Sequence, residues 1–107
     1  MGEEFIQIHT TTSSREEAQK IAEAVVSRRL AAACWISPPI TGIYWWKDKM
    51  EQEEAWVCLV KTRKELFEEV SKTIREFHSY ELPAVVATPM LMANEGYFDW
   101  IVAETTK

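Results

Sequence analysis

The longest patterned stretch of the chain covers residues 40–62 and predicts a β-hairpin. Its first arm, residues 40–46, alternates in polarity, so Tyr44 and Trp46 fall on one face. Its second arm, residues 55–60, is an unbroken apolar run, which is typical of a strand buried on both faces. The charged residues between the arms are expected to form the turn.

Two stretches repeat apolar residues at helical spacing and predict amphipathic helices. The first helix runs to about Arg29 and follows Ser13 or Ser14, either of which fits a capping box. The second helix covers residues 66–77, with Thr62 as the expected cap.

Further strands are predicted at residues 5–10 and 84–92, and a short last helix is expected to begin at Asn94. The order is β-α-β-β-α-β with an extra C-terminal helix, in one domain spanning residues 1–107. This order predicts an α+β, ferredoxin-like fold, in which both main helices cover one face of a four-stranded antiparallel sheet. The bare face and the three tryptophans of the hairpin predict a partner, most simply another copy of the chain.

Composition narrows the class of protein. The chain has 107 residues, of which 47% are hydrophobic and 27% charged, as in a soluble globular domain. The net charge of −5 includes no basic block, so no nucleic-acid partner is expected. No stretch is apolar enough for a membrane span or a secretory signal, and two cysteines are too few for a disulfide framework. A cytoplasmic location with reduced thiols is therefore expected.

The sequence predicts no enzyme. The loop after the first strand, TTTSSR, lacks the glycines of a phosphate-binding loop. The sequence also shows no Ser/His/Asp or Cys/His pattern of a nucleophile with its base. The apolar strand AWVCLVK also lacks the basic and aromatic pattern of an RNA-recognition motif, which shares the same order of elements.

Five segments, in this order along the chain, resemble the CutA family of divalent-cation tolerance proteins: RRLAAAC, IYWWKDKMEQEE, VKT, HSYELP and GYFDWI. The resemblance implies a ferredoxin-like subunit in a homotrimer, with strands paired between subunits. It also implies a metal-response or signalling role in the tolerance of divalent cations such as copper.

Residues of the family's type stand at Cys34, Tyr44, Trp46, Lys49, Lys61, Thr62, His78, Tyr80, Tyr97 and Trp100. The chain departs from the family at four positions: Ala55 and Ala84 stand where glutamate is common, Ser79 replaces proline and Asp48 replaces glycine. The stretch from residue 34 to 44 is about one residue shorter than usual, which would shift strand register or remove a bulge.

Three residues are candidate metal ligands, and each has an alternative role. Cys34 would bind a soft metal as thiolate or pack as a small apolar residue, which is also the expectation for Cys58. His78 would act as a ligand or interact with the C-terminal end of the second helix. His9 would meet its copies on a trimer axis or simply end a strand.

Two weaker candidates are expected to have structural roles. Met90 and Met92 suit copper(I), but methionines more often fill gaps in cores and interfaces. Glutamates at positions 51, 53 and 54 would attract a hard cation, although a solvated charged turn is the ordinary interpretation.

Lys61 supports a second functional hypothesis. A lysine that ends an apolar strand beside a predicted helix start would bind a small anionic metabolite. Tyr44, Trp46 and Tyr80 would line this cleft across a subunit boundary, with Trp100 as a further candidate. The alternative is a strand-end lysine whose ammonium reaches solvent. The sequence thus predicts a homotrimeric copper-tolerance protein that binds a metal ion, or else a regulatory trimer that binds an anion.

Overall fold

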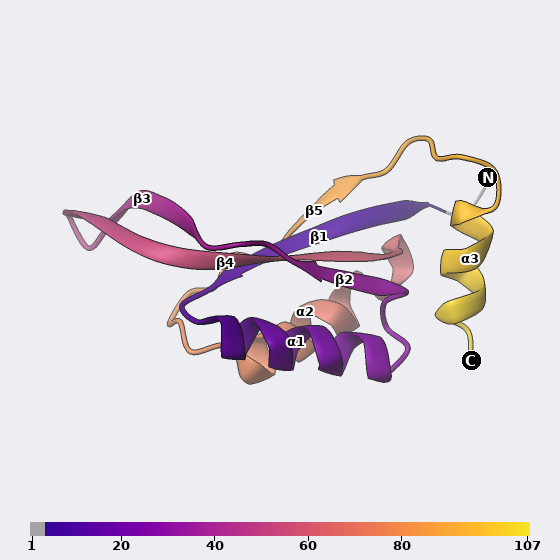
Figure 1. The fold of residues 1–107 in the computed structure, drawn as a ribbon, viewed down its shortest axis with the longest axis horizontal. Coiled ribbons are helices and arrows are strands. Elements are labelled where there is room, and N and C mark those ends of the chain that lie inside the picture. The colour runs from indigo at the N-terminus through magenta and orange to yellow at the C-terminus, as the bar shows by residue number, and fades with distance from the viewer. Residues whose placement is uncertain (1–3) are drawn as a thin grey trace.

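The computed structural model describes residues 4–107, whose elements follow the predicted order (Figure 1). The strands and helices are β1 (Phe5–Thr12), α1 (Arg15–Ser27), β2 (Ala33–Ile36), β3 (Ile40–Trp46), β4 (Lys49–Arg63), α2 (Phe67–Phe77), β5 (Val86–Pro89) and α3 (Tyr97–Glu104). A single 3₁₀ turn, η1 (Lys64–Leu66), leads from β4 into α2.

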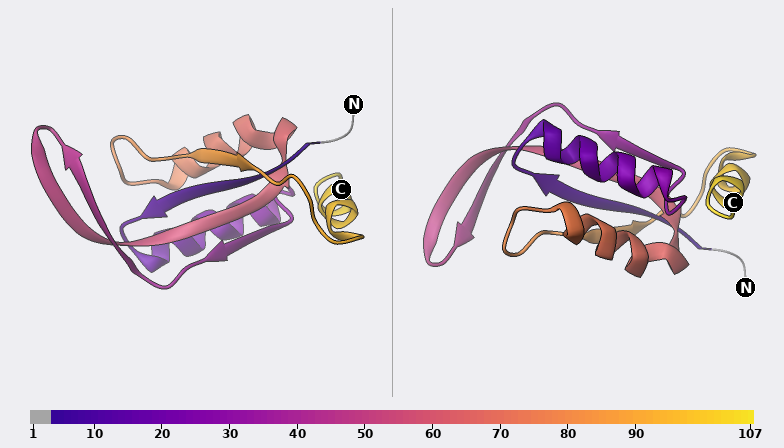
Figure 2. Two further views of the ribbon diagram at one scale, coloured as in Figure 1. Left: turned by 90° about the horizontal axis from the view of Figure 1, so that it is seen from above. Right: turned by 90° about the horizontal axis from the view of Figure 1, so that it is seen from below.

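Four strands form an antiparallel sheet in the order β2-β4-β1-β5, and β3 pairs with the far part of β4. Helices α1 and α2 lie side by side against one face of this sheet (Figures 1 and 2). The prediction of a ferredoxin-like α+β fold is confirmed. We call the opposite face, which neither α1 nor α2 covers, the helix-free face.

A fifth strand, β2, precedes the predicted first hairpin arm and is separated from it by two prolines. Pro38 and Pro39 have no N–H group to donate to a strand partner, so regular pairing stops there. Ser37 bridges the break: its N–H donates to the carbonyl of Val57, and its hydroxyl accepts from the N–H of Val57, both at 2.9 Å. Pairing with β4 resumes at Ile40.

The hairpin is confirmed, but its turn is shorter than predicted. Only Lys47 and Asp48 connect β3 to β4, with φ angles of 51° and 66°. Positive φ at both central residues allows the two strands to pair immediately on either side of the turn. The glutamates at positions 51, 53 and 54 therefore lie in β4, and the prediction of a charged turn there was wrong. The hairpin projects beyond the helices (Figure 1).

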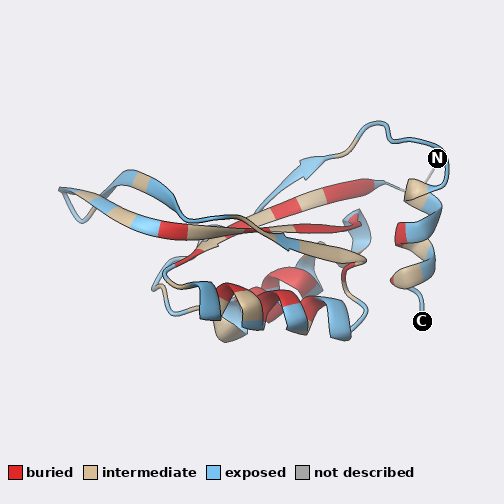
Figure 3. Cartoon of the chain, in the orientation of Figure 1, coloured by how far each residue is buried: buried red, intermediate tan, exposed pale blue. Residues whose placement is uncertain are grey.

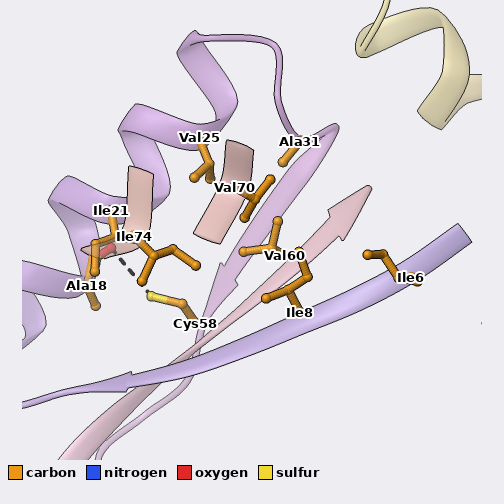
Figure 4. Packing of buried hydrophobic residues seen from close by; sticks show 10 residues of the cluster. All are labelled: Ile6, Ile8, Ala18, Ile21, Val25, Ala31, Cys58, Val60, Val70 and Ile74. Atoms are coloured by element: carbon orange, nitrogen blue, oxygen red, sulfur yellow. Dashed lines mark hydrogen bonds between the residues drawn. The ribbon is translucent and has the colours of Figure 1, made fainter. Parts of the chain in front are cut away.

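The hydrophobic core lies between the sheet and the two helices (Figures 3 and 4). Its fully buried side chains come from four elements: Ile8 of β1, Ile21 and Val25 of α1, Cys58 and Val60 of β4, and Val70 and Ile74 of α2. Burying an aliphatic side chain of this size contributes about 1.5–3 kcal/mol, so these contacts hold both helices against the sheet.

The helix starts agree with the sequence in one case of three. Ser14 caps α1, and its hydroxyl accepts from the N–H of Glu17 at 3.1 Å. Thr62 does not cap the second helix, because β4 continues through it and its hydroxyl donates to the carbonyl of Leu30 at 2.6 Å. Asn94 does not cap the last helix; Gly96, with φ of 91°, precedes it instead.

Helix α3 packs at the end of the sheet away from the hairpin (Figure 1). The rings of Phe98 and Phe5 stack with centroids 4.1 Å apart. Arg63 donates to the hydroxyl of Thr105 at 2.8 Å and to its carbonyl at 3.1 Å. Within residues 4–107 no helix is long and apolar enough to cross a membrane.

Candidate functional site

A cavity of about 490 Å³ opens where the hairpin meets the end of β1 and the loop after α2. We call it the tyrosine–glutamate pocket. Its lining residues are Thr11, Tyr44, Trp46, Glu53, Ser79, Tyr80, Glu81, Leu82 and Ala84. Three aromatic residues that the sequence nominated for a ligand cleft, Tyr44, Trp46 and Tyr80, therefore line one pocket within a single chain.

Strand geometry brings the hairpin residues to this pocket. Tyr44 and Trp46 are two residues apart in β3, so both side chains project from the same face. The register places Glu51 opposite Tyr44 and Glu53 opposite Gly42. The phenol of Tyr44 thus reaches Glu53 diagonally across the strand pair.

Glu53 connects two tyrosines. Its Oε1 accepts a hydrogen bond from Tyr44 at 3.0 Å and another from Tyr80 at 2.8 Å. Burial, followed by the bond to Glu53, raises the pKa of Tyr80, whereas the bond to Glu53 is the main cause that raises the pKa of Tyr44. Within residues 4–107, Oε2 of Glu53 accepts no hydrogen bond, so half of this carboxylate is available.

His78 fixes the loop that carries Tyr80. It follows α2, its Nε2 lies 2.7 Å from the carbonyl oxygen of Thr11, and its Nδ1 accepts from the N–H of Tyr80 at 3.2 Å. In this arrangement Nε2 donates to the carbonyl of Thr11 and Nδ1 accepts from the N–H of Tyr80. Both ring nitrogens are engaged by backbone groups, so a metal at His78 would have to displace one of these bonds.

Charged groups surround the pocket. Oε2 of Glu17 accepts from the N–H of Ser79 at 2.8 Å, while Oε1 is buried and without a partner among the described residues. At the rim, Nζ of Lys47 lies 3.5 Å from Oε1 of Glu81 and 5.6 Å from the ring centroid of Trp46. Carboxylates thus outnumber cationic groups around this pocket.

A sequence model of the family described as CutA1 divalent ion tolerance protein matches residues 6–104. The chain belongs to this family. It is 33% identical over 103 residues to the divalent-cation tolerance protein CutA of Pyrococcus horikoshii, which covers 96% of this chain and all of that protein. It is 29% identical over 100 residues to the chloroplastic protein CutA 1 of Oryza sativa subsp. japonica, covering 94% of this chain but only 56% of that protein.

A solved structure agrees with this assignment. The periplasmic divalent cation tolerance protein CutA from Archaeoglobus fulgidus superposes with a TM-score of 0.91 at 35% identity, covering 94% of this chain and 98% of that chain. The names of these CutA relatives indicate no enzymatic activity.

Two departures from the CutA pattern lie close to the pocket. Ala55 is buried in β4 opposite Ile40, and Ala84 lines the pocket wall. At both positions the chain has alanine instead of the glutamate that the family resemblance led us to expect. The acidic character of the pocket therefore comes from Glu53, Glu81 and the neighbouring Glu17 in this chain.

The three predicted metal ligands lie apart in the single chain. Cys34 faces the helices from β2, His9 lies on the helix-free face of β1, and His78 lies beyond the end of α2. Across the part of the chain that the structure describes, no group of three or more His, Cys, Asp or Glu side chains is placed to hold a metal ion.

Cys34 instead has a second thiol beside it. In the antiparallel register Cys34 pairs with Val60 and Ile36 with Cys58, so the two cysteines are diagonal neighbours on the core side of the sheet. The interaction between the two neighbouring thiols raises the pKa of Cys34 and lowers that of Cys58. Cys58 also contacts the carbonyl of Ala18 at 3.6 Å (Figure 4). Sequence spacing gave no sign of this pair, because 23 intervening residues separate the two positions.

Lys61 lies on the helix-free face, away from the tyrosine–glutamate pocket. It pairs with Gln7, whereas Thr11 of the pocket lies four residues further along β1, about 13 Å away at the usual rise of a strand. Its ammonium donates to Oε1 of Gln7 and lies 3.9 Å from the ring centroid of Trp35. Only 7% of Lys61 is exposed, and this burial lowers its pKa. An anion at Lys61 would have to replace Gln7, so this hypothesis stays a prediction.

The remaining candidates lie near the C-terminus. Trp100 belongs to α3, where its ring centroid is 5.6 Å from that of Tyr97, and α3 is at the other end of the sheet from the hairpin (Figure 1). Met90 is half-buried and Met92 is fully exposed in the chain described. Neither lines the tyrosine–glutamate pocket.

Sequence reasoning assigned Glu53 to a solvated turn and did not nominate Glu17 for a site. Residues 51–54 are all polar and show no alternation, so the shared face of Glu51 and Glu53 follows only once β4 is known to begin at Lys49. No signal existed for Glu17 either, because its partner Ser79 is 62 residues away.

Proposed function

We propose that this chain acts in divalent-cation tolerance as a non-enzymatic homotrimer that binds a metal ion, with copper as the first candidate. Membership of the CutA1 family and the names of its relatives support the role in tolerance. We also propose a cytoplasmic location, and the free thiols of Cys34 and Cys58 are consistent with a reducing compartment.

The helix-free face and the hairpin support the assembly into a trimer. Trp35 and Val86 are exposed on the helix-free face, and Ile43, Trp45 and Met50 are exposed on the hairpin. Large exposed apolar side chains gathered on one side of a sheet and on a projecting arm mark surfaces that a partner covers. A second and third copy would supply that cover.

One observation carries the proposal of direct metal binding: the thiols of Cys34 and Cys58 are diagonal neighbours on the core side of the sheet. Thiolates are soft ligands that select copper(I) over hard cations. The neighbouring thiol of Cys34 lowers the pKa of Cys58, so the pair can lose a first proton at Cys58, which provides the thiolate that a soft metal needs. Reduced copper held between the two sulfurs would be removed from solution.

The test is an anaerobic titration of copper(I) against a competing chelator. We expect one copper per chain in the unaltered protein and loss of this site in Cys34→Ser and in Cys58→Ser. His78→Gln and His9→Gln serve as matched comparisons, because they remove the other two predicted ligands. Copper binding that survives the double cysteine variant would overturn the thiol site, and its loss with either histidine would assign the metal elsewhere.

A further inference from the structure

The tyrosine–glutamate pocket combines aromatic walls with negative charge. Rings of Tyr44, Trp46 and Tyr80 line it, and Glu53 and Glu81 supply carboxylates. Its volume of about 490 Å³ lies within the range of small-molecule sites. Aromatic faces next to a carboxylate are the surroundings that proteins use for organic cations.

Hydrogen bonding leaves negative charge exposed to this space. Both tyrosine hydroxyls donate to Oε1 of Glu53, so their protons are committed and cannot serve an incoming anion. Oε2 of the same carboxylate has no hydrogen bond within residues 4–107. Glu17, behind Ser79, adds a carboxylate whose Oε1 is buried and unpartnered among the described residues.

Lys47 shows that the rim already receives an alkylammonium group. Its Nζ lies 5.6 Å from the ring centroid of Trp46 and 3.5 Å from Oε1 of Glu81. Both side chains of this ion pair are largely exposed, at 68% and 72%, and exposed pairs of this kind are weak. A free ammonium ion can therefore compete with Lys47 at low energetic cost.

We propose that the tyrosine–glutamate pocket binds a small alkylammonium ion. The ammonium group lies against Oε2 of Glu53, and the alkyl chain packs on the rings of Trp46 and Tyr80. This site is separate from the thiol pair, which faces the core on the other side of the sheet. Its ligand is an organic cation, in contrast to the anion of the second hypothesis drawn from the sequence for these aromatic residues.

The experiment is an NMR titration of the full chain that follows the indole N–H of Trp46, because weak binding remains measurable in this way. The probes are n-butylammonium, the neutral n-butanol and the anionic n-butyrate. We expect saturable shifts with n-butylammonium only. Equal binding of n-butanol would show that the pocket recognises only the alkyl chain. Preferential binding of n-butyrate would show that the pocket prefers an anion. Either result overturns the proposal.

Variants separate charge from shape. Glu53→Gln keeps the size of the side chain but removes its charge, and we expect affinity for n-butylammonium to fall about tenfold. Glu54→Gln is the matched control: it removes a charge from the next residue of β4, which faces away from the pocket, and should leave affinity unchanged.

Lys47→Gln removes the internal competitor and should strengthen binding of n-butylammonium about twofold. Unchanged affinity in Glu53→Gln contradicts the proposal. If Glu53→Gln fails to fold, Tyr80→Leu serves instead, because it keeps the Trp46 indole as the reporter while removing a ring that lines the pocket, and it should weaken binding.

Discussion

At the scale of single residues, the carboxylate of Glu53 ties the alkaline stability of the protein to two tyrosines. Their pKa values lie above the ordinary value of about 10, so the folded chain holds these protons more tightly than the unfolded chain. The stability linked to Tyr44 and Tyr80 is therefore complete below about pH 10 and is lost as the pH rises above it.

Glu53→Gln should weaken this dependence. Without the carboxylate, the phenols of Tyr44 and Tyr80 lose a charged acceptor, and their ultraviolet absorbance titration should move to lower pH. Unfolding by urea at a series of alkaline pH values should show a shallower loss of stability in the variant. Glu54→Gln is the control, and an equal shift in both variants would indicate a general charge effect instead of the specific hydrogen bonds.

Residue types were easier to predict from the sequence than residue partners. The aromatic members of the pocket stood out because the alternation in β3 places Tyr44 and Trp46 on one face. Their acceptor, Glu53, was assigned to a turn because clustered charges resemble a loop. The thiol pair was invisible for a related reason: a diagonal contact between β2 and β4 depends on strand register, which spacing along the chain does not reveal.

At the scale of elements, the two-residue hairpin turn has a backbone conformation that the sequence did not predict. Lys47 and Asp48 both adopt positive φ, a conformation that strains residues with a Cβ, although it costs aspartate less than lysine. Neither residue is the glycine or asparagine expected of a two-residue hairpin turn. The turn was therefore predicted to be longer than it is.

Asp48→Gly should stabilise the protein. Glycine adopts φ of 66° without a Cβ clash, although its greater freedom in the unfolded chain offsets part of the gain, which leaves about 0.5 kcal/mol. Urea unfolding checks this as a higher midpoint. Asp48→Asn should lie between the two, because asparagine tolerates this conformation better than most residues. A lower midpoint for Asp48→Gly would contradict the strain.

Helix positions followed from apolar periodicity, whereas two of the three caps did not. The apolar faces of α1 and α2 pack against the sheet, so the burial of these faces determines where the two helices form. A cap depends on where the preceding strand stops. Thr62 fits a capping motif, but the pairing of β4 with β1 continues through Arg63 and keeps Thr62 in the sheet.

At the scale of the whole molecule, one chain leaves an unusual amount of apolar surface uncovered. Trp45 is 73% exposed on the hairpin, and Trp35 is 56% exposed on the helix-free face. Lys61 is nevertheless almost fully buried beside Trp35, which shows that this face is already partly dehydrated. The proposed trimer would account for the exposed tryptophans, because neighbouring copies would cover them.

The proposed trimer predicts a mass in solution of three times the 12.4 kDa chain. It also predicts that the unfolding temperature rises with protein concentration.

Trp45→Glu places a charge on the projecting hairpin, where a desolvated carboxylate would be costly. The variant should shift the mass toward the monomer while the circular dichroism spectrum stays unchanged. Val26→Glu is the matched control, since Val26 is 37% exposed on α1, away from the hairpin. Light scattering distinguishes the outcomes. A monomeric unaltered chain at micromolar concentration would refute the trimer, whereas an intact trimer in Trp45→Glu would remove the hairpin from the interface and leave the helix-free face as the surface to test.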